Sequence, residues 1–154
     1  YQKNVFVDSI DVSDDALSIA QKNVDKHELT DRVHLKKCNV LNYQNELNGQ
    51  QCDMLVSNPP YISNSEFEML SKNVKDFEPH LALKDGNDGL TFYKAIINLS
   101  HQLLKTDGWL LFEVAYNQSE DVKSILHEAK FQNIEAVLDL ERIPRVIKGQ
   151  KVSS

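Results

Sequence analysis

The sequence predicts an α/β fold in which a mostly parallel sheet is covered by helices on both faces. Short apolar runs alternate along the chain with segments whose apolar residues recur at helical spacing. No internal repeat and no Pro/Gly/Ser-rich linker interrupts this alternation. The 154 residues, 41% of them apolar and 26% charged, suffice for one hydrophobic core but not for two. We therefore expect one domain over residues 1–154.

The first half of the chain supplies three predicted strands and one helix: strands at Val5–Ile10, Arg32–Lys37 and Cys52–Ser57, and a helix from Ser13 to about Lys26. Ser13 is the expected N-cap of that helix, because its side-chain oxygen can accept from a free N–H of the first turn. Asp14 and Asp15 then suit the positive end of the helix dipole. Asn58-Pro59-Pro60 ends the third strand, because proline has no backbone N–H for a ladder.

The second half continues the alternation. Its expected elements are a short helix at Glu66–Val74, an irregular stretch through Gly89, a helix from Leu90 to about Lys105, a strand at Trp109–Val114, a helix carrying Val122, Ile125, Leu126 and Ala129, and strands at Ile134–Leu138 and Arg145–Ile147. This order favours βαβ units, whose ligands bind beyond the carboxyl ends of the strands.

Composition excludes several classes of function. The net charge of −6 and the pI near 5.3 argue against a surface that binds nucleic acid mainly through phosphates. No apolar run is long enough to span a membrane. Cys38 and Cys52 are too far apart for a redox CxxC motif, and the five histidines lack the spacing of zinc ligands, so no metal site is expected.

The residues at the predicted strand ends are the candidates for chemistry. They are Asp11, Asn39, Asn58 and Glu113. Asp11 supports two interpretations of about equal weight: a carboxylate that accepts from ribose hydroxyls, or an aspartate that helps to cap the next helix.

The segment Asn58-Pro59-Pro60-Tyr61 is the most specific feature of the chain. The Asn58 side-chain oxygen and the Pro59 carbonyl can each accept one N–H of an amine or amide whose nitrogen must attack an electrophile. The two prolines fix φ at successive positions, so that both acceptors point toward one place, and Tyr61 can stack on a planar group. The alternative is a rigid strand-to-loop turn with a buried tyrosine.

The block Asp53–Ile62, which contains this segment, resembles the amide- and amine-directed class I S-adenosylmethionine methyltransferases. Three further motifs narrow the resemblance to the protein-(glutamine-N5) methyltransferases of peptide-chain release factors: Phe77-Glu78-Pro79-His80-Leu81-Ala82-Leu83, Gly86-Asn87-Asp88-Gly89-Leu90-Thr91-Phe92-Tyr93 and Glu113-Val114-Ala115-Tyr116-Asn117-Gln118. The resemblance covers Tyr1 to Lys148. It implies a three-layer, Rossmann-like fold in which the last two strands form an antiparallel hairpin. It also implies a cytoplasmic or organellar location, and a monomer that binds neither a specific nucleic-acid sequence nor a membrane.

The resemblance also implies roles for individual residues. S-adenosylmethionine is the expected cofactor, with Asp11 at its ribose and Asn39 and Val40 beside its adenine. The family holds the substrate amide with a short segment, called the clamp here, which matches Asn58, Pro59, Pro60 and Tyr61. Asn58 is also expected near the transferred methyl group. Glu78 and Pro79 are secondary candidates in a loop beside the site. The expected protein substrate is a peptide-chain release factor.

Three departures from the family accompany this resemblance. Asn39 stands where the family usually has Asp, although an amide oxygen can still accept from the adenine amino group. Glu141–Arg145 replaces a turn that usually contains glycine. The family's glycine-rich loop and first strand have no counterpart, so we expect the 154-residue chain alone neither to bind the cofactor nor to fold with normal cooperativity. Two other functions remain open: an adenine-N6 or guanine-N2 nucleic-acid methyltransferase, and a non-catalytic domain of the same fold.

Overall fold

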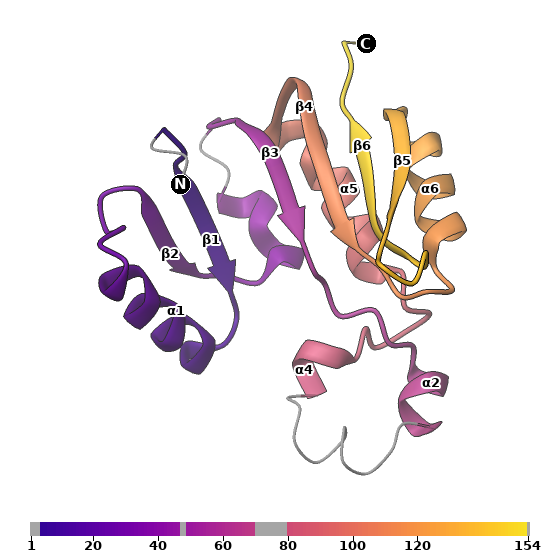
Figure 1. The fold of residues 1–154 in the computed structure, drawn as a ribbon, viewed down its shortest axis with the longest axis horizontal. Helices are drawn as coiled ribbons and strands as arrows, with labels where there is room; N and C mark the ends of the chain where they lie inside the picture. Colours follow the sequence, from indigo (N-terminus) through magenta and orange to yellow (C-terminus); the bar gives the residue numbers. More distant parts are fainter. Residues whose placement is uncertain (1–3, 47–48, 70–79, 154) are drawn as a thin grey trace. The chain divides into compact units, whose positions relative to one another are not determined.

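The computed structural model describes residues 4–46, 49–69 and 80–153, and the chain divides into two compact units. The smaller unit is Tyr1–Glu46 and the larger unit is Leu47–Ser154. Figure 1 shows the elements of both. Each unit is described by itself below. In the described residues, no helix combines the length and apolar character that crossing a membrane requires.

The smaller unit is a parallel two-stranded sheet with one helix. Its elements are β1 (Val7–Asp11), α1 (Asp14–Lys26), β2 (Val33–Lys37) and the 3-10 helix η1 (Val40–Glu46). The register runs from Val7 opposite Val33 to Asp11 opposite Lys37. The predicted N-cap is confirmed, because the Ser13 hydroxyl accepts from the Ala16 N–H at 3.2 Å.

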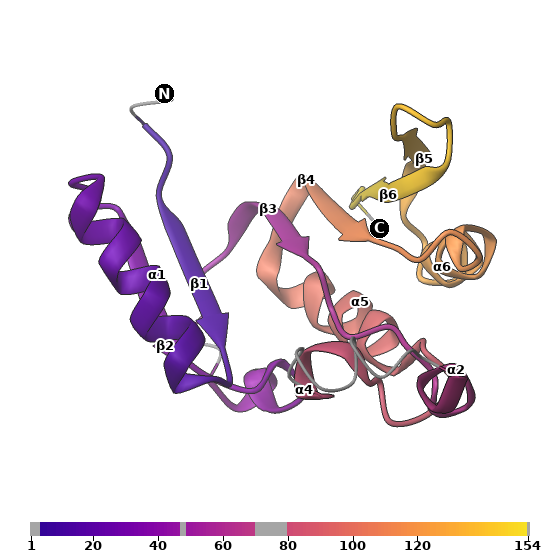
Figure 2. The same ribbon diagram turned by 60° about the horizontal axis from the view of Figure 1, so that its bottom comes forward.

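The larger unit is a mixed four-stranded sheet in the order β3-β4-β6-β5. Its elements are β3 (Cys52–Ser57), α2 (Asn64–Met69), α4 (His80–Leu83), α5 (Thr91–Leu103), β4 (Leu104–Glu113), α6 (Ser119–Glu128), β5 (Gln132–Leu138) and β6 (Pro144–Gln150). β3 and β4 are parallel, and β6 is antiparallel to both of its neighbours. Figures 1 and 2 show α5 and α6 on one face of this sheet.

The predicted order of elements is confirmed, with differences in detail. The helix expected at Glu66–Val74 begins earlier, at Asn64, and its described part ends at Met69. The stretch expected to be irregular contains the short helix α4, and η1 was not predicted. β1 and β3 belong to separate sheets, and the expected C-terminal antiparallel hairpin is formed by β5 and β6.

The core of the larger unit lies between its sheet and the two covering helices. Tyr93 of α5 and Phe112 of β4 are fully buried, and their rings meet edge to face with centroids 5.1 Å apart. The Tyr93 hydroxyl donates to the Glu113 carbonyl at 2.9 Å, which fixes the carboxyl end of β4. Burial raises the pKa of Tyr93 well above its usual range, so the hydroxyl stays protonated.

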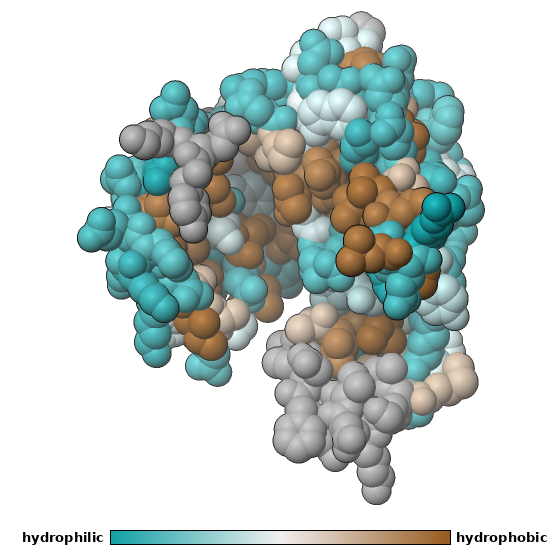
Figure 3. All heavy atoms as spheres, viewed as in Figure 1, coloured by the Kyte–Doolittle hydropathy of each residue, from teal (hydrophilic) through white to brown (hydrophobic). Residues whose placement is uncertain are grey.

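The opposite face of the same sheet carries exposed hydrophobic residues. Leu55 is half-buried, whereas Met54 and Val56, which point the other way on β3, are 53% and 68% exposed. Val137 of β5 is also exposed. Figure 3 shows hydrophobic residues on the visible face of this unit.

The β5–β6 turn forms without a glycine among residues 139–143. The Asp139 side-chain oxygen Oδ1 accepts from the Glu141 N–H at 2.8 Å and the Ile143 N–H at 2.9 Å. The bond from Ile143 is the largest cause of a lowered Asp139 pKa, followed by the bond from Arg145. Arg142 completes the turn with φ of +63°, a conformation that costs a non-glycine residue about 1–2 kcal/mol.

Replacing Arg142 with glycine is expected to stabilise the larger unit by about 0.5–1 kcal/mol. The substitution removes the strain of a left-handed side-chain-bearing residue, and part of this gain is lost to the greater entropy of glycine in the unfolded chain. Urea unfolding of Arg142→Gly and Arg142→Ala measures the difference. The alanine variant keeps the positive φ and should show no gain; equal stability of the two variants would contradict the interpretation.

The two units are expected to differ in stability within the isolated 154-residue chain. Among the described hydrophobic residues, the smaller unit buries only Val24 and Cys38, whereas most of the core belongs to the larger unit. Amide hydrogens of β1 and β2 should therefore exchange faster than those of β4 and β6. Hydrogen-exchange mass spectrometry tests this. Equal protection across both sheets would show that the chain folds as one cooperative body.

Candidate functional site

The loop Asn58–Tyr61 begins where β3 stops, directly after Ser57. Ser57 still pairs with Phe112 of β4, and the two prolines that follow cannot donate to a ladder. Asn58 is exposed, Pro59 is buried, and Pro60 and Tyr61 are half-buried. At the end of the strand, the polar Asn58 side chain is therefore exposed, while the next residue, Pro59, is buried.

This loop forms one wall of a pocket of about 280 Å³. The pocket is lined by Asn58, Tyr61, Ile62, Ala82 and Leu83. Its volume lies just under the ~300–1,000 Å³ of sites for drug-sized ligands, so it suits a small group such as a single side chain.

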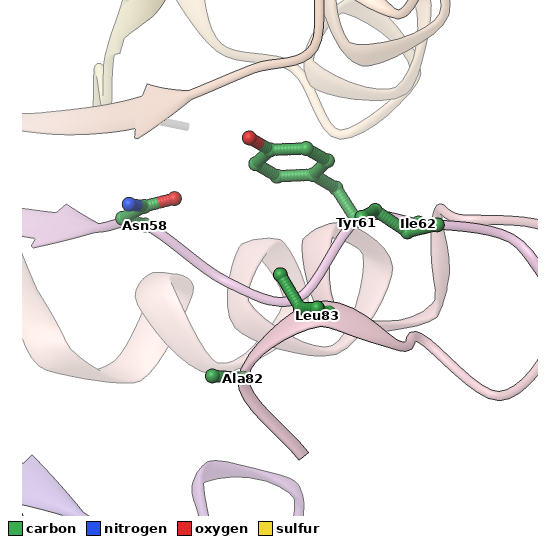
Figure 4. Close-up of a pocket in the computed structure, with 5 residues that line it drawn as sticks. All are labelled: Asn58, Tyr61, Ile62, Ala82 and Leu83. Carbon is green, nitrogen blue, oxygen red and sulfur yellow. The ribbon is translucent and has the colours of Figure 1, made fainter. Parts of the chain in front are cut away.

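The pocket places polar groups and an aromatic face together. Figure 4 shows the Asn58 amide and the Tyr61 ring on the same side of the loop, with Leu83 of α4 pointing toward them. In the part of the chain that the structure describes, neither the Asn58 side-chain oxygen nor the Pro59 carbonyl accepts a hydrogen bond. The Asn58 acceptor lines the pocket and is exposed to a donor that enters from outside, whereas Pro59 is buried and is not among the lining residues.

Backbone hydrogen bonds hold the two walls of the pocket together. The Ile62 N–H donates to the Leu83 carbonyl at 3.0 Å, and the Asp85 N–H donates to the Ile62 carbonyl at 2.9 Å. Ile62 and Lys84 form an isolated parallel bridge. These backbone hydrogen bonds directly link the motif that contains Asn58 with the motif that ends at Leu83. The two motifs are far apart in the sequence, so the sequence alone did not predict this contact.

Ser63 and Glu66 form a capping box at the start of α2. The Ser63 hydroxyl accepts from the Glu66 N–H at 3.3 Å, and the Glu66 carboxylate accepts from the Ser63 hydroxyl at 2.7 Å and the Ser63 N–H at 3.1 Å. The bonds from Ser63 are the main cause of a lowered Glu66 pKa, and Asn117 adds a weaker bond at 3.3 Å. The Ser-x-x-Glu pattern of residues 63–66 could have predicted this anchor from the sequence.

The candidate cofactor residues lie in the smaller unit. Asp11 ends β1, and its carbonyl accepts from the Cys38 N–H at 2.9 Å, directly before Asn39. Parallel pairing therefore brings Asp11 and Asn39 to the same edge of this sheet, as the sequence analysis expected. Val40 is the half-buried first residue of η1.

Both polar side chains already make local hydrogen bonds. One oxygen of the exposed Asp11 carboxylate accepts from the Ser13 N–H at 2.8 Å, which agrees with the capping interpretation. The second oxygen has no such bond among the described residues. The Asn39 oxygen Oδ1 accepts from the Leu41 N–H at 3.0 Å, so its amide NH₂ group is the end free of this turn.

The expected site residues are divided between the two units. Asn58 and Tyr61 line one pocket of the larger unit, whereas Asp11, Asn39 and Val40 belong to the smaller unit. Glu78 and Pro79 fall outside the described residues. Glu113 is exposed at the end of β4, where its carbonyl receives the Tyr93 hydroxyl.

Comparisons with known proteins agree with the resemblance seen in the motifs. Residues 1–83 match the model of a family described as methyltransferase small domain. The chain is 37% identical over 147 residues to a release factor glutamine methyltransferase of Clostridium acetobutylicum, covering 96% of this chain and 51% of that protein. It is 39% identical over 119 residues to a ribosomal protein uL3 glutamine methyltransferase of Francisella tularensis, covering 75% of this chain and 37% of that protein.

Solved structures agree on the fold. The crystal structure of a methyltransferase from Pyrococcus furiosus superposes with a TM-score of 0.68 at 13% identity, covering 97% of this chain and 64% of that one. The expected class I methyltransferase fold is thereby confirmed. The chain spans about half the length of the curated relatives that it matches, or less.

The Glu66 pKa is expected to rise when Ser63 is replaced by alanine. Hydrogen bonds from Ser63 favour the carboxylate, so they lower the pKa and contribute stability that is present above the ordinary glutamate pKa and lost as the pH falls through the lowered value. NMR titration of Glu66 in Ser63→Ala measures the change. Asn117→Ala should give a smaller rise, because its bond is the weaker cause; a larger rise than in Ser63→Ala would reverse this assignment.

Proposed function

Because the chain belongs to the methyltransferase small domain family, we propose that the full-length protein methylates the side-chain amide nitrogen of a glutamine in a peptide-chain release factor, using S-adenosylmethionine. The observation that carries this proposal is the pocket beside Asn58 and Tyr61, whose acceptors suit an amide NH₂ group. Similarity to two glutamine methyltransferases, at 37% and 39% identity, supports the same amino acid as substrate.

The two acceptors of the clamp, on Asn58 and Pro59, would compensate for the low reactivity of a glutamine amide nitrogen. The lone pair of an amide nitrogen is delocalised into its carbonyl, so the nitrogen attacks poorly. Acceptance of one N–H by the Asn58 side-chain oxygen and of the other by the Pro59 carbonyl holds the nitrogen in place and favours its pyramidal form. Tyr61 offers its ring to the planar amide. Rate then comes mainly from positioning and from preorganised dipoles.

Residues of the smaller unit fit a nucleoside cofactor. Asp11 would accept from ribose hydroxyls with its second carboxylate oxygen, and Asn39 and Val40 would lie beside the adenine. When bound, S-adenosylmethionine supplies a methyl group on a positively charged sulfur. The Asn58 and Pro59 acceptors would hold the glutamine nitrogen in line with that methyl group, and the methylated nitrogen would lose one proton to water.

Methyl transfer to glutamine is tested with the purified full-length protein and radiolabelled S-adenosylmethionine. Release factor, ribosomal protein uL3 and an adenine-containing oligonucleotide are offered separately. We expect label on one glutamine of the release factor, located by tandem mass spectrometry. Label on uL3 would mean that the protein methylates glutamine but that its substrate is a ribosomal protein. Label on the oligonucleotide alone would contradict the proposal.

Asn58→Ala is expected to lower kcat on the glutamine substrate by about 10²–10³-fold, because one oriented acceptor is lost from the clamp. Calorimetry with S-adenosylhomocysteine should show a nearly unchanged Kd. The matched control is Asn98→Ala, which removes an exposed asparagine of α5. If Asn58→Ala retained more than about a third of the wild-type kcat, a difference below 1 kcal/mol, the clamp would be refuted.

A further inference from the structure

One buried glutamine, Gln118, connects three of the sequence motifs: its own, the one that contains Tyr61 and the one that contains Gly89. The proposed function assigns a role only to the motif that contains Tyr61. Gln118 ends the motif Glu113–Gln118 and is 6% exposed. Its side-chain nitrogen donates to the Tyr61 carbonyl at 2.9 Å and to the Gly89 carbonyl at 3.3 Å. We propose that Gln118 is a positioning residue that holds the Asn58–Tyr61 loop in its reactive geometry; the expected loss of turnover rests on the proposed function.

The orientation of the Gln118 amide follows from its partners. Both are carbonyl oxygens, so only the nitrogen end of the amide can face them. The amide oxygen has no partner among the described residues, although it is buried. A buried acceptor without a partner is destabilising, and the two bonds made by the nitrogen offset that cost. The amide therefore acts as a donor that spans two segments.

Gly89 is required where the two carbonyls approach each other. Its φ is +88°, and a side-chain carbon added there would lie 2.6 Å from the Gln118 nitrogen and 2.7 Å from the Tyr61 carbonyl oxygen. The Gly89 N–H in turn donates at 2.9 Å to the carboxylate of Asp85, which is 7% exposed. Gly89 is thus held by Asp85, two residues after the end of α4, as well as by Gln118.

The position of the Tyr61 carbonyl restricts the position of Asn58, because the two prolines between them make the chain stiff. Two successive prolines have fixed φ, so few torsions separate the Tyr61 carbonyl from Asn58. Gln118 itself is anchored at the start of α6, where its N–H donates to the Ala115 carbonyl and its carbonyl accepts from the Val122 N–H. A displaced Tyr61 carbonyl therefore moves the clamp, and a misplacement of about 1 Å can lower a rate by about 10²-fold.

Gln118→Met tests the two hydrogen bonds in the full-length protein. Methionine has a similar length but donates nothing, so we expect kcat on the glutamine substrate to fall at least tenfold. The Kd of S-adenosylhomocysteine and the KM of the protein substrate should change less than twofold and threefold, respectively. Gln132→Met, at an exposed position of β5, is the matched control and should keep the wild-type kcat. A kcat for Gln118→Met within twofold of wild type overturns the proposal.

Gly89→Ala tests the same contact from its other side. Gly86→Ala is the matched control, because Gly86 has a φ of +86° and open space around its added carbon. Both variants carry backbone strain, but only Gly89→Ala displaces the Tyr61 carbonyl. We expect a fall in kcat at least tenfold larger in Gly89→Ala than in Gly86→Ala. Equal effects would show that strain alone matters and would overturn the proposal.

Hydrogen exchange provides a readout that does not depend on catalysis. In Gln118→Met, amides of Tyr61–Asn64 should exchange at least tenfold faster than in the wild type, while those of β4 and β6 keep their rates. Unchanged exchange at Tyr61–Asn64 overturns the positioning role. If the wild-type protein methylates no glutamine, the proposed function fails, and this exchange comparison alone then decides whether Gln118 holds the loop.

Discussion

The end of β3 at Ser57 is the constraint on which the candidate site depends. Pro59 and Pro60 remove two backbone donors, so the pairing with β4 cannot continue and the chain must leave the sheet. Their fixed φ values then set the path of the chain as far as Tyr61. Because Pro59 is buried and Asn58 is exposed, this path holds the backbone inward and presents the amide outward.

A loop that leaves a sheet needs partners for its own polar groups, and these come from distant parts of the chain. Ile62 exchanges backbone hydrogen bonds with Leu83 and Asp85, and the Tyr61 carbonyl receives the Gln118 side chain. Ser63 and Glu66 cap each other at the next turn. These bonds occupy the Tyr61 carbonyl and the backbone groups of Ile62, whereas no described residue donates to the Asn58 side-chain oxygen or to the Pro59 carbonyl. In the proposed function, these two acceptors would receive the N–H groups of the substrate amide.

Patterns of neighbouring residues predicted most helices and strands, whereas the contacts that join these elements depend on residues far apart in the sequence. Cys52–Ser57 was predicted with its observed bounds because an apolar run ends at two prolines, and Ser13 was predicted as an N-cap because capping depends on adjacent residues. The helices η1 and α4 were missed, since each is short and has no apolar stripe of its own. The roles of Gln118 and Gly89 could not be predicted, because the partner of each lies on another segment and no local pattern encodes it.

The described side chains that line the pocket are one amide, one phenol and three apolar groups. In the described part of the chain, the lining residues Asn58, Tyr61, Ile62, Ala82 and Leu83 include no carboxylate and no imidazole. Tyr93 lies in the core behind them, and its raised pKa keeps its hydroxyl a donor to the Glu113 carbonyl. In the proposed methylation, the neutral amide nitrogen becomes strongly acidic only after it gains a methyl group, so loss of the proton follows methyl transfer. Water would then take the proton, and Asn58 and Pro59 would hold the nitrogen in line.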